Sequence, residues 1–244
     1  MDLEESRIRE VANAGMGRPD VLTFWFGESD EVTPDIVRQA AIESMQNGET
    51  FYAHNLGLPE LRQAVSDYMS ALHGPVGVDR IAITSGGVNA LMLAAQALID
   101  AGDEVVAVTP VWPNLTAQAL VMGAQLTCVP LRPVNGQWQL DLTALKSAIT
   151  DKTRLLIVNS PNNPTGTQLS ITAMKDIVQG VTDRGGFTII DEIYQSLCYD
   201  SAAQSVLQIT GAPSAQWPLV VINSFSKYFG MTGLRLGWMV VPDA

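Results

Sequence analysis

Lysine is scarce in this chain of 244 residues, which has four lysines, and its 14 basic residues stand against 25 acidic ones. The resulting formal net charge of −11 repels phosphate backbones, and no cluster of basic residues offsets it locally. We therefore expect neither a nucleic acid nor an anionic membrane surface as a partner. A small molecule is the better match for such a surface.

Cysteine is also rare: Cys128 and Cys198 lie in separate apolar runs, with no metal-ligand spacing around either. We expect both thiols to be reduced packing residues, and we predict no metal site. No apolar run reaches membrane-spanning length, and the acidic, amphipathic N-terminal segment does not resemble a signal peptide. These absences indicate a cytoplasmic protein.

Short β-branched runs alternate with helical stretches from about residue 78 onward, which predicts a mainly parallel sheet covered by helices. The length suits one sizeable domain or one and a half. We expect strands at 81–84, 104–110, 125–131, 154–160, 187–190, 218–226 and 236–242. Helices are expected at about 4–13, 34–46, 59–72 and 89–102, from residue 141, and at 170–186.

Helix boundaries are marked by capping residues. Asp141 and Ser170 are expected to accept the free amide hydrogens of the helices that follow them, and Thr33-Pro34 is the expected cap and first-turn pair of the helix at 34–46. Gly102 is the expected C-cap of the helix at 89–102. The segment between the first two helices, FWFGESDEVTP, is predicted to be an irregular arm.

Polar and small residues follow most of the predicted strands, at the edge where open α/β sheets bind ligands. The first such segment is Ser85-Gly-Gly87, between a strand and a helix. Its glycines allow close backbone approach and expose amide hydrogens at a helix start, which suits a phosphate. The same pair is also compatible with a tight turn that binds nothing, and it matches neither a Walker loop nor a GxGxxG motif.

The segment Asp191-Glu-Ile-Tyr194 follows the predicted strand at 187–190 and begins with a carboxylate, Asp191. Emerging from an apolar strand, it requires a cation or several hydrogen-bond donors. A helix cap or turn is the alternative role for Asp191. Tyr194 is compatible with a core position in which only the hydroxyl reaches the surface.

Two further loops carry candidate residues. The loop at 159–166, NSPNNPTG, holds side-chain amides in fixed positions through two Xaa-Pro bonds, and Asn163-Pro164 is a candidate cis bond. The loop at 109–114, TPVWPN, places Trp112 at the end of a strand. That indole is either a packing residue or a stacking platform for a flat ligand.

Lys227 differs from the other three lysines because Phe225, Tyr228 and Phe229 surround it, whereas the others have polar neighbours. A desolvated lysine loses its proton easily and becomes a nucleophile toward carbonyl groups. Arg235 follows after a glycine-containing turn and suits an oxyanion such as phosphate. A surface lysine and a salt-bridged arginine are the alternative interpretation of this pair.

The segments SGG, WPN, NNPTG, DEIY and SFSKYFGMTGLRLG, in this order, resemble the pyridoxal-phosphate-dependent aminotransferases of class I/II, the fold-type-I family. The resemblance runs from about residue 20 to the end of the chain. It implies an α/β fold, a three-layer αβα sandwich with a mainly parallel seven-stranded sheet. Residues 1–45 would form an N-terminal helix and substrate-binding arm, and residues 46–244 a pyridoxal-phosphate-binding large domain.

The resemblance also implies that the chain is incomplete at its C-terminus, because family members continue into a small domain. The arginine that pairs with the substrate α-carboxylate would lie in that part.

The resemblance assigns roles to individual residues around pyridoxal 5'-phosphate. Lys227 would form the Schiff base with the cofactor aldehyde, and Asp191 would keep the pyridine nitrogen protonated. Asn163 and Tyr194 would hydrogen-bond the phenolic oxygen, and Trp112 would stack on the ring. The catalytic set is therefore Lys227, Asp191 and Tyr194.

Binding of the phosphate would use backbone amides and side chains at Gly86, Gly87, Val88, Ser224 and Arg235. Val88 departs from the hydroxyl or lysine found there in many members, which removes one side-chain contact. Tyr52 would reach the phosphate site of a neighbouring subunit, so the resemblance implies a homodimer. Gly27, in a segment similar to the family's GEPD, would touch the substrate carboxylate, with Trp112 and Asn163 also on the substrate.

The implied activity is transfer of an amino group between an amino acid and a 2-oxo acid. Two alternatives are a β-eliminating C–S lyase on the same fold and a pyridoxal-phosphate-binding effector-sensing module. The segment before the arm is too short for the DNA-binding domain that such a module carries. The WPN tripeptide resembles the aspartate aminotransferase branch, whereas the segment around Lys227 is closer to the broader class.

Overall fold

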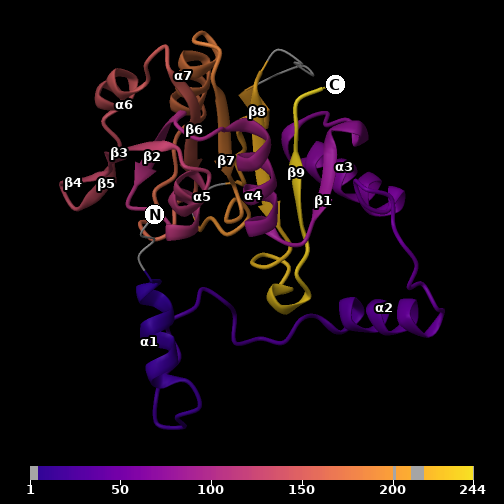
Figure 1. Ribbon diagram of the computed structural model, residues 1–244. Coiled ribbons are helices and arrows are strands. Elements are labelled where there is room, and N and C mark those ends of the chain that lie inside the picture. Colours follow the sequence, from indigo (N-terminus) through magenta and orange to yellow (C-terminus); the bar gives the residue numbers. More distant parts are fainter. Residues whose placement is uncertain (1–4, 200–201, 210–216, 244) are drawn as a thin grey trace.

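The computed structural model describes residues 5–199, 202–209 and 217–243. It shows one central sheet between layers of helices, with an N-terminal helix, an extended arm and a second helix lying beneath one edge (Figure 1). The helices are α1 (Arg7–Gly15), α2 (Asp35–Gln46), α3 (Pro59–His73), α4 (Gly87–Leu98), α5 (Pro113–Val121), α6 (Leu142–Ala148) and α7 (Ile171–Thr182). Three short 3-10 helices are Val78–Arg80, Val206–Ile209 and Thr232–Leu234.

The strands are β1 (Ile81–Thr84), β2 (Glu104–Thr109), β3 (Gln125–Pro130), β4 (Arg132–Val134), β5 (Gln137–Gln139), β6 (Thr153–Asn159), β7 (Phe187–Asp191), β8 (Leu219–Ser224) and β9 (Gly237–Val240). Seven of them form the main sheet in the order β1-β9-β8-β7-β6-β2-β3, and β4 pairs with β5 in a separate hairpin. All neighbours in the main sheet are parallel except β9, which is antiparallel to β1 and β8. The predicted mainly parallel seven-stranded sheet is confirmed.

The antiparallel strand matters for the position of the site. Gly237, the first residue of β9, pairs with Thr84 at the end of β1 and with Ser224 at the end of β8. The start of β9 therefore lies at the edge where β1, β2, β3, β6, β7 and β8 end. We call this edge the carboxyl edge.

The strands bury both faces because successive side chains point to opposite sides of a sheet. In β2, Val105 and Ala107 pack in one core with residues of α4 and α5. Val106 and Val108 pack in a second core with residues of α3, α6 and α7. Two cores with alternate residues of the same strand confirm the three-layer αβα sandwich.

Two of the expected N-caps are confirmed. Asp141 Oδ1 accepts hydrogen bonds from Thr143 N (2.9 Å) and Ala144 N (3.0 Å), and Ser170 Oγ accepts one from Ala173 N (3.2 Å). These side chains satisfy amide hydrogens that have no acceptor inside the helix.

Two other cap predictions are wrong. Helix α4 ends at Leu98, and Gly102 lies in the following turn with φ of +94°, where its amide donates to Gly123 O (2.9 Å). Helix α2 has no side-chain N-cap hydrogen bond, since the Thr33 hydroxyl instead donates to Gly230 O (2.6 Å). Thr33 therefore links distant parts of the chain.

The cysteine prediction holds only in part. Both Cys128 and Cys198 are free thiols. Cys128 is exposed, because β3 is an edge strand whose side chains are mostly uncovered, and Cys198 lies half-buried beyond the end of β7. Neither is a core residue.

The sequence prediction omitted two elements. Helix α5 begins at Pro113, a residue whose fixed φ suits the first helical position. The β4–β5 hairpin turns at Asn135 and Gly136, which have φ of 51° and 78°. Asn-Gly is the strongest short-range signal for a two-residue hairpin turn, so both elements were marked in the sequence.

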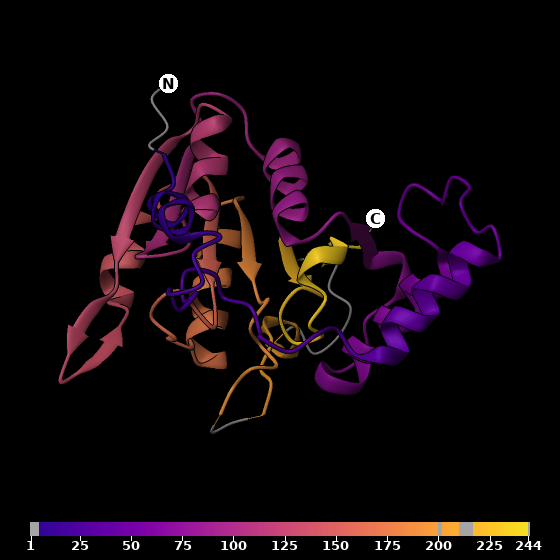
Figure 2. The same ribbon diagram turned by 90° about the horizontal axis from the view of Figure 1, so that it is seen from below.

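The arm runs beneath the carboxyl edge. Figure 2, a view from below, shows the segment between α1 and α2 crossing under the strand ends. Helix α2 has no buried residue, and large apolar side chains on the arm are exposed, among them Phe24 and Val32. Within the described ranges, no helix is long and apolar enough to cross a membrane.

Gly237 packs too closely for any side chain. A Cβ there would lie 2.8 Å from Gly86 C, 2.9 Å from Gly87 N and 3.0 Å from Asn223 O, all of them backbone atoms. We expect Gly237→Ala to lower the free energy of unfolding by about 1–3 kcal/mol, measured by urea denaturation, because backbone cannot move aside cheaply. Gly233→Ala, where no atom lies within 4 Å, is the matched control. Equal stability of the two variants would contradict this packing argument.

Candidate active site

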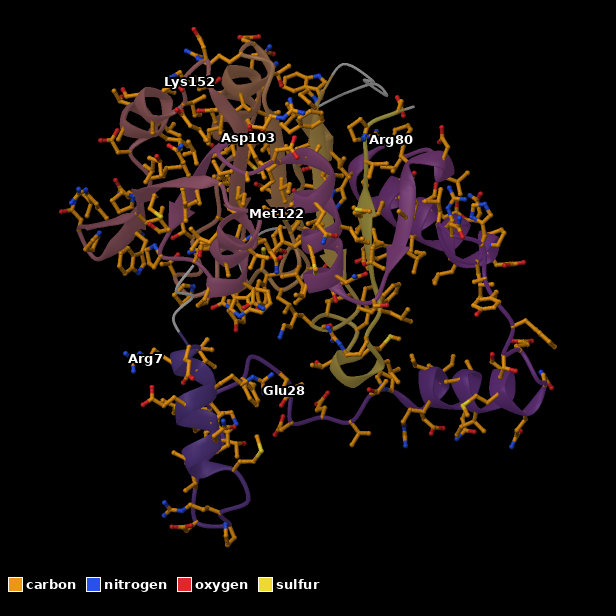
Figure 3. The ribbon with its side chains drawn as sticks, in the orientation of Figure 1. Arg7, Glu28, Arg80, Asp103, Met122 and Lys152 are labelled. Atoms are coloured by element: carbon orange, nitrogen blue, oxygen red, sulfur yellow. The ribbon has the colours of Figure 1, made fainter. Side chains whose placement is uncertain are left out.

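The candidate site lies at the carboxyl edge, where several elements end or begin together. Asp191 is the last residue of β7, Ser224 is the last of β8, and Gly86 precedes α4. Figure 3 shows the two ends of the sheet: Arg80 and Lys152, which precede strands, lie at the opposite edge, whereas Glu28 on the arm lies beneath the carboxyl edge.

The loop after β6 is fixed by Asn159. Its amide nitrogen donates to Asp191 O (3.0 Å), and its amide oxygen accepts from Asn163 N (2.7 Å). The Asn163-Pro164 bond is cis, as predicted, and so are Ser160-Pro161 and Thr109-Pro110. The Asn163 side-chain amide then donates to Tyr194 Oη (3.4 Å), so the structure brings Asn163 and Tyr194 together.

Asp191 is a buried carboxylate with little local compensation. Its exposed fraction is 7%, and Oδ1 accepts one hydrogen bond, from Ile193 N (3.1 Å). Burial raises the pKa of Asp191 to about 6, while the Ile193 hydrogen bond and the positive charge of Lys227 oppose this shift. A cation placed against the carboxylate would restore the ionised form.

Lys227 is the half-buried amine of this site. Its Nζ donates to Gly27 O on the arm (2.5 Å) and lies 6.0 Å from the centre of the Tyr194 ring. Burial lowers the pKa of Lys227, and the charge of Arg235 lowers it further, while the carboxylates of Glu28 and Asp191 act in the opposite direction. The amine is therefore easier to deprotonate than a surface lysine.

The pKa of the Tyr194 phenol is raised above its usual value. Burial is the largest cause, the negative charge of Asp191 adds to it, and the hydrogen bond from Asn163 acts against it. Tyr194 therefore keeps its proton and can donate it in a hydrogen bond.

A second group of residues forms a cradle beside Lys227. Arg235 has left-handed backbone dihedrals, φ 56° and ψ 53°, and its Nη1 donates to Thr232 O (2.7 Å) and Ser226 Oγ (3.4 Å). Ser224 Oγ donates to Ser226 Oγ (2.8 Å). A non-glycine residue in this conformation carries a cost that the surrounding structure must offset, which is common at ligand sites.

Gly86 completes the cradle. It has φ of +92°, and a Cβ there would lie 2.5 Å from Arg235 Nη2. Ser226 joins this cradle although the sequence analysis did not assign it a role. The alternation Ser224-Phe225-Ser226 was the available signal, since two hydroxyls two positions apart can face the same side.

Three expected site residues lie outside these contacts. Val88 is half-buried in the first turn of α4, and Trp112 packs half-buried against the core formed with α4 and α5. Tyr52 is fully exposed in the segment between α2 and α3. Gly27, in contrast, contacts the site, since its carbonyl oxygen accepts a hydrogen bond from Lys227 Nζ; its expected contact with a substrate carboxylate stays a prediction.

Residues 20–244 match the family of class I and class II aminotransferases. The chain belongs to this family. It is 34% identical over 242 residues to the aspartate aminotransferase of Pyrococcus horikoshii, covering 99% of this chain and 61% of that protein. It is 33% identical over 242 residues to a probable aspartate/prephenate aminotransferase of Aquifex aeolicus, covering 98% and 59%.

Among solved structures, the crystal structure of Pyrococcus protein-A1 superposes with a TM-score of 0.89 at 31% identity, covering 98% of this chain and 61% of that one. The chain therefore spans less than two thirds of the length of these relatives.

Class I and II aminotransferases use pyridoxal 5'-phosphate. The residues at this site fit that group. The site offers several hydrogen-bond donors for a phosphate. They are the Arg235 guanidinium, the hydroxyls of Ser224 and Ser226, and the backbone amides at the glycine-containing start of α4. Asp191 forms no ion pair with a cation among the described residues, and a protonated ring nitrogen would supply one. No group of three or more His, Cys, Asp or Glu residues in the described part of the chain could hold a metal ion.

Glu192 is a second buried acid beside Asp191. Its exposed fraction is 1%, Oε1 accepts from Val206 N (2.7 Å), and Oε2 has no partner among the described residues. Burial raises the pKa of Glu192 to about 8, against an ordinary value of 4.5, and the charge of Asp191 adds to this shift. The folded protein therefore holds a proton at Glu192 that the unfolded chain releases.

Stability should depend on pH through Glu192. Because the folded pKa is raised, the stabilisation is full below the unfolded pKa and is lost as pH rises toward about 8. A glutamine side chain at this position has no such proton to lose. We expect the free energy of unfolding of Glu192→Gln, relative to wild type, to increase between about pH 5 and about pH 8. Exposed Glu43→Gln is the control, and a constant difference for Glu192→Gln would show that Glu192 is ionised in the fold.

Proposed function

We propose that the complete protein transfers an amino group between an amino acid and a 2-oxo acid, using pyridoxal 5'-phosphate. The observation that carries the proposal is the arrangement of Lys227, whose pKa burial lowers, near the buried carboxylate of Asp191 and beside the Arg235 cradle. The names of the relatives make aspartate the first donor to test.

The bound cofactor supplies an aldehyde that reacts with amines and a ring that withdraws electrons from the substrate α-carbon. The Arg235 guanidinium, the Ser224 hydroxyl and the backbone amides at Gly86, Gly87 and Val88 bind its phosphate. Trp112 provides an aromatic surface for the ring. These groups fix the position and orientation of the cofactor.

Asp191 holds the proton on the ring nitrogen, because the buried carboxylate gains a cation there. Tyr194 Oη and the Asn163 amide donate to the phenolic oxygen. Lys227 Nζ would take a proton from the substrate α-carbon as general base, and the protonated amine would then be available as a general acid. Its lowered pKa favours the neutral amine that the first of these transfers needs.

The arm would contribute to substrate binding through the backbone at Gly27, and Trp112 and Asn163 would also contact the substrate. We propose the division into an arm at 1–45 and a cofactor-binding domain at 46–244. The protein acts as a cytoplasmic homodimer in which Tyr52, exposed in one chain, reaches the phosphate site of the other. Exposed apolar side chains on the arm support a second copy as the partner.

Lys227→Ala tests the amine. We expect purified wild-type protein with added pyridoxal 5'-phosphate to show a visible absorption band, and borohydride reduction should abolish that band and leave the cofactor irreversibly attached to the protein. The variant should lose the band and retain the fold, because it lacks the reactive nitrogen. Lys152→Ala, at an exposed position, is the control. A retained band in Lys227→Ala would remove Lys227 from the catalytic set.

Asp191→Asn tests the negative charge that would face the ring nitrogen. The variant keeps the size of the side chain but cannot stabilise a protonated ring nitrogen. We expect the rate of amino transfer to fall on the order of 100-fold or more, measured by single-turnover absorbance with aspartate. The exposed Asp183→Asn is the control. Undiminished turnover in Asp191→Asn would exclude the proposed role.

A further inference from the structure

The arm touches the Lys227 loop through few residues. From residue 27 to residue 36 every residue is exposed except Thr33. The surrounding chain offers little to hold this stretch in one register, since its side chains mostly face solvent. Within one chain, the position of the arm over the site therefore depends on a small number of contacts.

Two contacts tie the arm to the loop between β8 and β9. Lys227 Nζ donates to Gly27 O, and Thr33 Oγ1 donates to Gly230 O (2.6 Å). The contact points are six residues apart on the arm and three residues apart on the loop. At the second point, a Cβ on Gly230 would lie 3.9 Å from Pro34 Cδ, which is an ordinary van der Waals distance, so Pro34 lies beside the loop there.

The loop is a firm base for the Thr33 contact. Gly230 N donates to Lys227 O (3.1 Å), Met231 N donates to Phe225 O (3.1 Å), and Thr232 Oγ1 donates to Ser226 O (2.7 Å). These bonds fix the Gly230 carbonyl relative to the Lys227 backbone. A hydrogen bond from the arm to that carbonyl therefore fixes the position of the arm relative to the Lys227 backbone.

We propose that Thr33 is a positioning residue, whose hydroxyl clasps the arm onto the Lys227 loop and keeps the Gly27 backbone against the site. The inference rests on the proposed function for its catalytic consequence. The clasp itself needs no cofactor. It matters most when Lys227 Nζ is engaged elsewhere, because the Gly27 contact is then lost and Thr33 alone holds the register.

A capping role for Thr33 is the competing explanation. The structure argues against it, since α2 starts without any side-chain cap and the hydroxyl is a donor to a carbonyl 197 positions away. An N-cap side chain accepts hydrogen bonds from amides, whereas the clasp must donate one. Substitutions at residue 33 can separate these two roles.

The test uses three variants and a glutamate-specific protease, whose sites at Glu28 and Glu31 lie between the two contacts. Thr33→Val removes the donor and keeps the branched shape, and Thr33→Ser keeps the donor. Thr33→Asp is a good N-cap that cannot donate. Cleavage rates are followed by mass spectrometry, with the exposed site at Glu49 as an internal control for the fold.

We expect Thr33→Val and Thr33→Asp to be cleaved at Glu28 and Glu31 about fivefold faster than wild type, the effect of losing one hydrogen bond on a local opening. Thr33→Ser should be cleaved at the wild-type rate, as should the surface control Thr143→Val. Wild-type resistance in Thr33→Val or in Thr33→Asp would overturn the clasp, and so would failure of Thr33→Ser to restore it.

The second measurement links the clasp to catalysis. With pyridoxal 5'-phosphate bound, Thr33→Val should raise the amino acid concentration that gives half-maximal rate by about fivefold, with the maximal rate changed less. An unchanged half-maximal concentration would overturn the link to substrate. If wild-type protein binds no cofactor, the proposed function fails while the protease result still decides the clasp.

Discussion

Lys227 and Asp191 are close enough to influence each other's protonation, yet they form no direct ion pair in the described part of the chain. Each charge is partly or fully desolvated, which is costly when no partner compensates it. The fold must therefore hold two groups that would gain from moving together or toward water. Several contacts at the carboxyl edge keep Asp191 and Lys227 in these positions.

Asp191 is restrained by the sheet. Its strand lies between β6 and β8, and the side-chain amide of Asn159 on the neighbouring strand binds its carbonyl. Lys227 is restrained by an aromatic cluster behind its loop, in which Phe225 packs against Trp238 (4.8 Å between ring centres) and Phe229 (5.1 Å). The packing of these aromatic rings fixes the backbone of the loop, so the Lys227 side chain extends from a rigid segment.

The sequence predicted the strands well because each is a short apolar run ended by polar or small residues, and Asp141 and Ser170 act locally as caps. It failed where a side chain bonds across the fold. The Thr33 hydroxyl follows a cap pattern but its partner is Gly230, and Ser226 enters the cradle only because β9 brings Arg235 back beside it. The alternation Ser224-Phe225-Ser226 indicates two hydroxyls on one side, but the partners of Ser226 and Thr33 are set by the topology, which local patterns do not encode.

The charges at the site differ from the net charge of the whole molecule. A chain with a net charge of −11 repels a phosphorylated ligand at long range, and salt screens that repulsion beyond about 10 Å. At the Arg235 cradle, Lys227, Arg235 and the start of α4 favour an anion, although the carboxylates of Glu28 and Asp191 also act on Lys227. An anionic ligand at this site would therefore be held by short-range contacts, and its affinity would depend on the cradle geometry more than on the overall field. The left-handed backbone at Arg235 and the bare Gly86 are what make that geometry possible, because a side chain at residue 86 would meet the guanidinium.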